Sequence, residues 1–282
     1  LLKFYKKKQI IVCHFNHRIR GKLSDRDYVF VKDFCNERGL KLFYKSENIK
    51  ILAKKKKMGL EEMGRKRRRL FFEEVYKKVE ADKVILAHHQ DDQVETFLMR
   101  LARGTSLNGM ECMKINDEIY FRPMLYASKK DILEYINLNG LKFVQDDSNF
   151  DTNFTRNFIR LELLPKLKQL NPKFNDSISN LISNVSDVNS YLDDQINYFK
   201  ENFLYEFKKL KVLKLNSEIL ETRSLFKSLI YKVLIDDLNA GDDINSKNLD
   251  DIIRLTYSTK SSGQVHLSNS LIVEKGYKNI FF

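Results

Sequence analysis

Residues 84–96 read Val84-Ile85-Leu86-Ala87-His88-His89-Gln90-Asp91-Asp92-Gln93-Val94-Glu95-Thr96. The first four are apolar and predict a buried strand, and polar or ionisable side chains follow it directly. Beyond Gln93 the apolar residues recur at the spacing of an amphipathic helix packed against a sheet: Val94, Phe97, Leu98, Leu101 and Ala102. The polar residues therefore occupy the carboxyl end of a strand, which is where open α/β sheets bind ligands.

Two explanations compete for Asp91 and Asp92. Carboxylates at a helix N-cap or first turn satisfy free backbone N–H groups and complement the helix dipole, so both residues could be caps. Capping does not explain His88 and His89, because an imidazole does not help a helix to start and is costly when it is buried unpaired. We therefore interpret the junction as a functional site.

Strands and helices alternate through the first half of the chain, which predicts right-handed crossovers and a parallel sheet. Ser24 is a suitable N-cap and Gly39 a suitable C-cap for the first helix. The predicted elements are a strand over 9–15, a helix over 24–39, a strand over 40–44, a helix over 60–79, the strand ending at His88, a hairpin over 115–121 and a helix over 128–139 closed by Gly140.

The composition changes near Asn171. A long, otherwise polar helix is predicted there from the three-four spacing of Ile178, Leu181, Val185, Val188, Leu192, Ile196, Phe199 and Phe203. A further helix covers 225–234, and the tail over 264–282 reads as short strands. The fold class predicted is α/β: a doubly wound, mostly parallel sheet in residues 1–165, followed by a smaller, mainly helical domain in residues 166–282.

Charge and cysteine content indicate the kind of partner and the cellular compartment to expect. The chain has 282 residues, a net charge of +12 and three scattered cysteines, and a pI near 9.4. Such a balance suits a polyanionic partner, and the sharpest basic clusters are 54–57 and 65–69. The odd cysteine count argues against a disulfide framework, so we expect a cytoplasmic protein. No apolar run approaches the ~20 residues that cross a bilayer, so no membrane partner is expected.

Two more polar clusters accompany the central one. The first, over 14–21, follows the first strand with two histidines and two arginines, and it would lie near His88 if the two strands are close in the sheet. Such groups suit phosphate recognition, although a solvated basic loop would look the same. In the other cluster, over 146–160, Arg156 and Arg160 share one face if they are helical and could contact consecutive phosphates.

The motifs occur in a fixed order: 14–20, Glu61-Glu62 with Arg65 and Arg68, Ala87 to Thr96, Arg103-Gly104-Thr105, Arg122-Pro123-Met124, Asp147-Ser148-Asn149 and Arg156-Asn157-x-x-Arg160. This order resembles the bacterial tRNA(Ile)-lysidine synthases, which belong to the N-type ATP pyrophosphatases of the PP-loop superfamily with an adenine nucleotide alpha hydrolase-like fold. The resemblance covers about residues 9–170. The motifs are specific in combination, whereas any one alone indicates only the wider class.

The resemblance implies a ligase reaction. ATP adenylylates the C2 oxygen of the wobble cytidine in CAU-anticodon tRNA(Ile), pyrophosphate leaves, and the amine of free L-lysine displaces AMP to form lysidine. Implied roles are catalysis and Mg²⁺ binding for Asp91 and Asp92, and nucleotide binding for His14, Arg18 and His88. Contacts with tRNA or phosphate are implied for Arg65, Arg68, Arg156, Asn157 and Arg160.

One departure from the family pattern stands out. The family binds pyrophosphate with a Ser-Gly-Gly-x-Asp-Ser loop after its first strand, and this sequence contains no such string. The chain starts at Leu1, and Leu1-Leu2-Lys3-Phe4 resembles the end of the helix that follows that loop, so we expect an N-terminally incomplete sequence. Gly64 and Arg69 stand where the family tends to carry alanine and an aromatic residue. The additional C-terminal domain of longer members is also absent, which puts acceptor-stem recognition in doubt.

Two alternatives stay open from the residues alone. A metal-dependent phosphohydrolase could use the histidines and aspartates as ligands, but adjacent His88 and His89 in a strand would point to opposite faces. A tRNA-binding module without ATP turnover is the other alternative, because the phosphate loop is missing. A tRNA-thiolating enzyme would need a cysteine pair or an iron–sulfur cluster, and the three cysteines show no such spacing.

Overall fold

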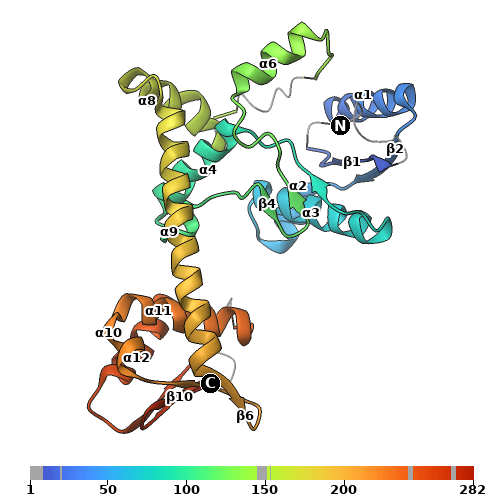
Figure 1. Cartoon of the computed structure of the whole chain (residues 1–282). Coiled ribbons are helices and arrows are strands. Elements are labelled where there is room, and N and C mark those ends of the chain that lie inside the picture. The colour runs from blue at the N-terminus through green and yellow to red at the C-terminus, as the bar shows by residue number, and fades with distance from the viewer. Residues whose placement is uncertain (1–8, 20, 145–150, 153, 241–243, 268–270) are drawn as a thin grey trace. The chain divides into compact units, whose positions relative to one another are not determined.

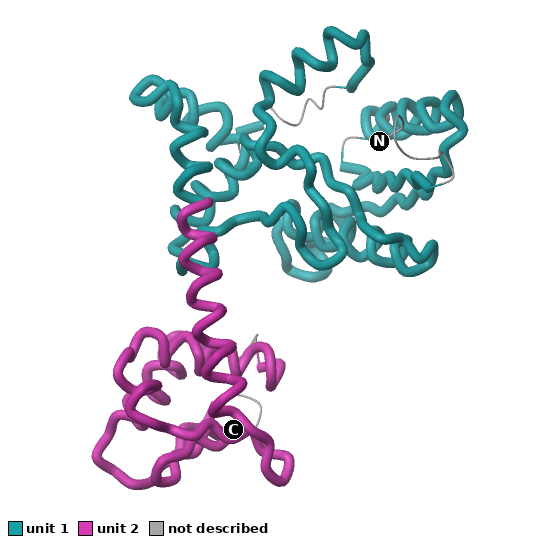
Figure 2. Tube along the Cα trace, viewed as in Figure 1, with its two compact units in different colours: residues 1–182 teal, residues 183–282 magenta. Residues whose placement is uncertain are grey.

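The computed structural model describes residues 9–19, 21–144, 151–152, 154–240, 244–267 and 271–282. The chain forms two compact units, Leu1–Ile182 and Ser183–Phe282 (Figure 2). No helix in the described ranges is both long and apolar enough to cross a membrane.

The first unit opens with a strand, a helix and a parallel strand. Strands β1 (Ile11–Asn16) and β2 (Lys41–Ser46) pair in parallel, and helix α1 (Lys22–Arg38) connects them. The predicted C-cap is confirmed, since Gly39 is left-handed (φ 63°) and its N–H bonds the Asn36 carbonyl. The predicted N-cap is wrong: Gly21 (φ 55°) caps the helix, because its left-handed backbone starts the first turn before Ser24.

A second group of strands carries the central motif. Strand β3 (Val84–Ile85) pairs in parallel with β5 (Tyr120–Phe121), which forms the predicted hairpin with β4 (Asn116–Asp117). The predicted α/β class is confirmed, but the described strands of the first unit form two hydrogen-bonded groups, β1-β2 and β3-β5-β4, and not one continuous sheet. The two polar strand ends that we expected near each other therefore lie in different groups.

Helix α3 (Leu60–Lys78) touches both groups (Figure 1). Lys45 on β2 bonds Glu74 at 2.8 Å, and the Tyr120 hydroxyl on β5 donates to Glu73 at 3.3 Å. The preceding short helix α2 (Ile49–Lys56) was not foreseen, although Asn48 caps it by accepting from the Ile51 N–H. Apolar residues of α2, α3 and β1 form one core, which includes Phe15, Ile49, Ala53, Met63, Phe71 and Val75.

The rest of the first unit is helical. Ser128 caps α6 by accepting from the Asp131 N–H, as its predicted position requires. The helices after β3 are α4 (Gln90–Arg103), α5 (Leu107–Met110), α6 (Lys129–Leu138), α7 (Thr155–Phe158), η3 (Ile159–Leu163), α8 (Leu164–Leu170) and α9 (Phe174–Phe203). The compact unit extends to Ile182, since Ile178 and Ile182 of α9 pack with Val94 and Phe97 of α4.

The second unit combines helices with a larger sheet than expected. Five antiparallel strands run in the order β6-β7-β10-β9-β8. The tail strands were predicted, whereas the β6–β7 hairpin was not. The elements after α9 are β6 (Leu204–Phe207), β7 (Leu210–Lys214), α10 (Ser217–Glu221), α11 (Arg223–Lys232), η4 (Val233–Asp237), α12 (Ser246–Tyr257), β8 (Ser262–His266), β9 (Ile272–Gly276) and β10 (Asn279–Phe281).

Candidate functional site

The start of α4 sets the geometry of the site. The chain leaves β3 in extended conformation, with His89 at φ −128° and ψ −178°, and becomes helical at Gln90. The Asp92 carboxylate then accepts the His89 backbone N–H at 3.0 Å, which satisfies one of the free donors of the first turn. The capping explanation is therefore correct for Asp92, but it uses only one of its oxygens.

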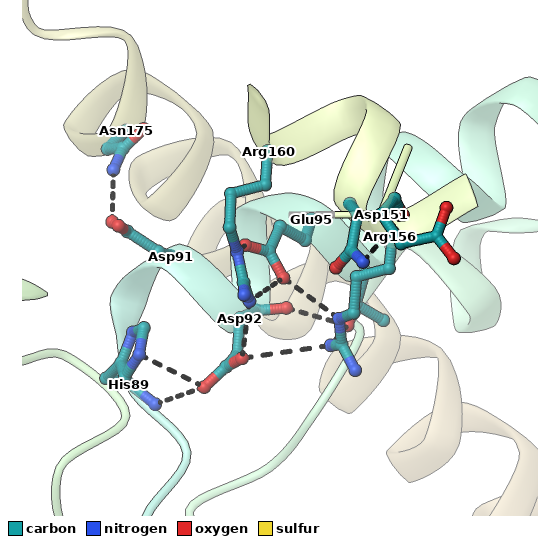
Figure 3. Close-up of polar contacts among 10 residues, drawn as sticks. His89, Asp91, Asp92, Glu95, Asp151, Arg156, Arg160 and Asn175 are labelled. Atoms are coloured by element: carbon teal, nitrogen blue, oxygen red, sulfur yellow. Dashed lines mark hydrogen bonds and ion pairs between the residues drawn. The ribbon is translucent and has the colours of Figure 1, made fainter. Parts of the chain in front are cut away.

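A buried carboxylate lies one turn further along α4. Glu95 is fully buried, and two arginines enclose it (Figure 3). Arg160 donates from Nε to Oε1 at 2.6 Å and from Nη2 to Oε2 at 2.9 Å, while Arg156 Nε donates to Oε2 at 2.9 Å. Charge-assisted bonds of this kind compensate the cost of removing a carboxylate from water. The pairing raises the pKa of Arg160, with the Glu95 hydrogen bond as the main cause.

The same arginines reach Asp92. Each guanidinium has its Nη2 atom 3.9 Å from Asp92 Oδ1. Arg156 Nη2 also donates to the Thr96 hydroxyl at 3.2 Å, and that hydroxyl donates to the Asp92 carbonyl at 2.7 Å. Two carboxylates and two guanidiniums thus form one network across α4, α7 and η3 (Figure 3).

The other side of the first turn is held by α9. The Asn175 amide donates to Asp91 Oδ1 at 2.6 Å (Figure 3). The buried Gln90 amide donates to Asp176 at 2.9 Å and to the Ser179 hydroxyl at 3.3 Å. Asp91 and Asp92 therefore face different neighbours, and the Oδ2 atom of Asp91 has no partner among the described residues.

His88 enters a crowded, positively charged environment. Burial lowers its pKa to about 4; Asp92 raises the pKa, while Arg122, Arg156 and Arg68 lower it further. The ring is consequently neutral at pH 7. Its buried Nδ1 atom has no hydrogen-bond partner in the described part of the chain.

Arginines from α3 supply the positive charge. Burial, followed by repulsion from Arg156, lowers the pKa of Arg65. Burial, followed by repulsion from Arg65 and Arg156, lowers that of Arg68. Neither side chain has an ion-pair partner within the described ranges, and both keep solvent-exposed surface. Buried Arg122 is different, because it bonds Asp117 at 3.2 Å and the Lys114 carbonyl at 2.7 Å.

The first unit matches a known family. The model of the PP-loop domain, named ATP_bind_3, matches residues 1–167. The chain belongs to the PP-loop domain family. Its tRNA(Ile)-lysidine synthase relative in Geobacter sulfurreducens is 33% identical over 278 residues, covering 97% of this chain and 59% of that protein. The one in Clostridium perfringens is 29% identical over 282 residues, covering 96% and 58%.

The chain thus spans a little over half the length of these curated relatives. Among solved structures, the U34-tRNA thiolase NcsA of Methanococcus maripaludis aligns with a TM-score of 0.50 at 15% identity, over 62% of this chain and 60% of that one. At that identity the likeness concerns the fold alone, and it supports the PP-loop assignment.

The first-strand residues of the PP-loop domain lie apart from this network. His14 stacks against Tyr44 with ring centroids 6.0 Å apart, and burial lowers its pKa while Asp27 raises it. Arg18 has a left-handed backbone (φ 49°), and its N–H donates to Asn16 Oδ1 at 2.8 Å. In the described part of the chain, neither residue forms a hydrogen bond or ion pair with Asp91 or Asp92. Nucleotide binding by His14, Arg18 and His88 stays a prediction.

The structure also shows the surroundings of the residues that were predicted to bind Mg²⁺ and RNA. Within the described ranges, no three His, Cys, Asp or Glu side chains gather as a metal site requires, and the Asp91 and Asp92 carboxylates face different partners. The geometry gives the phosphohydrolase alternative no support, and Mg²⁺ binding by these two residues stays a prediction. Asn157 is 8% exposed and donates to the Asp151 carbonyl at 2.8 Å, which leaves it little surface for RNA.

The sequence interpretation missed the residues that organise the site. It gave no role to Glu95, although a glutamate one turn after Asp91 and a pair of arginines one turn apart are a usable signal for an ion pair. It also missed Gln90 and Asn175, whose partners are more than 80 residues away in sequence. The predicted Asp147-Ser148-Asn149 motif lies outside the described residues.

Proposed function

We propose that this chain is the catalytic part of an ATP-dependent tRNA(Ile)-lysidine synthase. ATP adenylylates the C2 oxygen of the wobble cytidine in CAU-anticodon tRNA(Ile), pyrophosphate leaves, and the amine of free L-lysine displaces AMP. The names of the full-length relatives and the PP-loop family support this reaction. The observation that carries it is the network at the start of α4, which includes Asp91 and lies near Arg65 and Arg68, two arginines without an ion-pair partner in the described part of the chain.

The adenylylation step requires positive charge. When the cytidine oxygen attacks the α-phosphorus, negative charge develops on the departing pyrophosphate, and fixed cations near that group lower the barrier. We assign this role to Arg65 and Arg68, because neither forms a salt bridge with a carboxylate among the described residues. Arg156 and Arg160 bind Glu95, so we assign them to holding the carboxylates, with phosphate contact as a secondary role.

The second step requires a proton acceptor. The lysine ammonium must lose a proton before its nitrogen can attack C2 of the adenylylated cytidine. Asp91 Oδ1 accepts from Asn175, and Oδ2 is available to bind the ammonium and take the proton. Asp92 adds negative charge beside it. We also propose that Mg²⁺ accompanies ATP, that the unit after residue 182 contacts tRNA, and that the protein is cytoplasmic.

The reaction can be tested with a tRNA transcript. The 282-residue chain and the full reading frame that contains it would be incubated with CAU-anticodon tRNA(Ile), labelled lysine and Mg-ATP, and nucleosides would be analysed by mass spectrometry. We expect lysidine and AMP in equal amounts, and loss of both with Asp91→Asn. Absence of lysidine with both proteins would refute the proposal, and binding of tRNA without AMP formation would assign a tRNA-binding module instead.

A further inference from the structure

The β6–β7 hairpin of the second unit carries an unusual set of exposed side chains. Tyr205, Phe207 and Leu210 are 48%, 53% and 44% exposed. Phe207 pairs directly with Leu210, and Tyr205 lies two residues before Phe207, so all three project from one face of the hairpin. The base is anchored, because Leu213 is buried in the core of the unit and Val212 is also buried. Figure 1 shows the hairpin protruding from its unit.

The turn of the hairpin is made of two lysines. Lys208 and Lys209 have φ values of 48° and 71°, which the two-residue type I′ turn requires and which glycine and asparagine adopt far more readily than lysine. Lysine at both positions is thus unfavourable for the backbone, and a role for the charge explains it. Lys208 Nζ lies 5.4 Å from the centre of the Phe207 ring, so a cation and an aromatic ring lie next to each other at the tip of the hairpin.

The positive charge of the hairpin indicates which kind of ligand it binds. Residues 204–214 contain four lysines and one glutamate, and only Lys211 pairs with that glutamate, Glu206, at 3.4 Å. A second copy of the chain added to the edge strand β6 would bring two such positive hairpins together. A polyanion with flat apolar faces is complementary, and unpaired RNA is such a ligand, because its bases stack on aromatic rings and its phosphates bind lysines.

We propose that the β6–β7 hairpin binds unpaired RNA nucleotides, with Tyr205 and Phe207 stacking on bases and Lys208 and Lys209 contacting phosphates. The surface is separate from the network at the start of α4. The choice of RNA as partner agrees with the proposed tRNA substrate but does not depend on lysidine formation.

The test measures binding of fluorescein-labelled oligouridine to the full 282-residue chain by anisotropy over a salt series. Tyr205→Ser with Phe207→Ser should weaken binding about tenfold or more, the size of a lost base–aromatic stack. Tyr277→Ser is the matched control, since Tyr277 is an 85% exposed tyrosine at another turn of the same sheet, and it should bind as wild type. Equal losses in both variants would overturn the proposal.

A second variant tests the charges without weakening the fold. Lys208→Asn with Lys209→Gly removes two cations and gives the turn residues that favour its backbone. The slope of log affinity against log salt should become shallower by about 1.4, and the urea midpoint should not fall. Two results would overturn the proposal. One is an unchanged slope of log affinity against log salt. The other is a variant that binds RNA as the wild type does but no longer binds polyglutamate. Lysidine formation is assayed separately, so its absence would leave this result intact.

Discussion

Glu95→Gln is the most informative single substitution in the first unit. The carboxylate is fully buried and accepts three hydrogen bonds from Arg156 and Arg160. Glutamine has nearly the same shape, but one of its two oxygens becomes an NH₂ group. That group would direct a donor at a guanidinium donor, so at least one of the three bonds is lost and the negative charge disappears.

The expected loss of stability follows from the burial. Removing one partner of a buried ion pair costs roughly 3–5 kcal/mol, because the remaining charges are left without compensation. The arginine side chains are 27% and 25% exposed, so water screens part of the effect and the lower end, about 3 kcal/mol, applies. For a domain of this size, about 3 kcal/mol lowers the melting temperature by roughly 6–12 °C.

Urea and thermal unfolding followed by circular dichroism would measure this loss. Glu162→Gln is the matched control, since Glu162 is an exposed glutamate in the adjacent η3 segment and should change the melting temperature very little. If Glu95→Gln melts within a degree or so of wild type, the ion-pair network does not hold the first turn of α4, and the assignment of Arg156 and Arg160 as positioning residues is wrong.

Three further predictions address other parts of the chain. Because burial lowers the His88 pKa from 6.5 to about 4, the unfolded chain binds this proton more readily, so stability should be fully present above pH 6.5 and fall as the pH drops toward 4. His88→Gln should flatten that dependence in unfolding titrations. Replacing Lys54, Lys55 and Lys56 with alanine should make the salt slope of tRNA binding shallower by about 2, as filter binding would measure; an equal slope would exclude phosphate contacts at α2. Lys275→Met should destabilise the second unit by about 3 kcal/mol in urea, because the buried ammonium donates to the carbonyls of Leu255, Thr256 and Ser258 at the end of α12.

Local patterns predicted much of the fold because they report local physics. The stripe from Val94 to Leu101 predicted α4, and the glycine at position 39 predicted where α1 ends. The β6–β7 hairpin escaped prediction because its turn, Lys208-Lys209, has none of the residues that usually mark a type I′ turn. The helical spacing that continues to Phe203 also gave no sign that a strand follows immediately.

The polar site was only partly predictable for a different reason. The junction of β3 and α4 is formed by consecutive residues, so its position could be inferred from the sequence. The partners of Glu95 are 61 and 65 residues away, and those of Gln90 are 86 and 89 residues away. Periodicity carries no information about such pairings, and the arginines therefore looked like phosphate ligands when they were considered alone.

Charge balance connects the network to the proposed chemistry. Arg156 and Arg160 pair with Glu95 and lie 3.9 Å from Asp92, so these four groups hold the first turns of α4 together. Among the residues that the structure describes, the Asp91 carboxylate forms no ion pair, and neither Arg65 nor Arg68 does. A site with one carboxylate and two guanidiniums that have no ion-pair partner among the described residues is complementary to a cationic amine and a polyphosphate together. Those are the two small substrates that an ATP-dependent lysine ligase must hold.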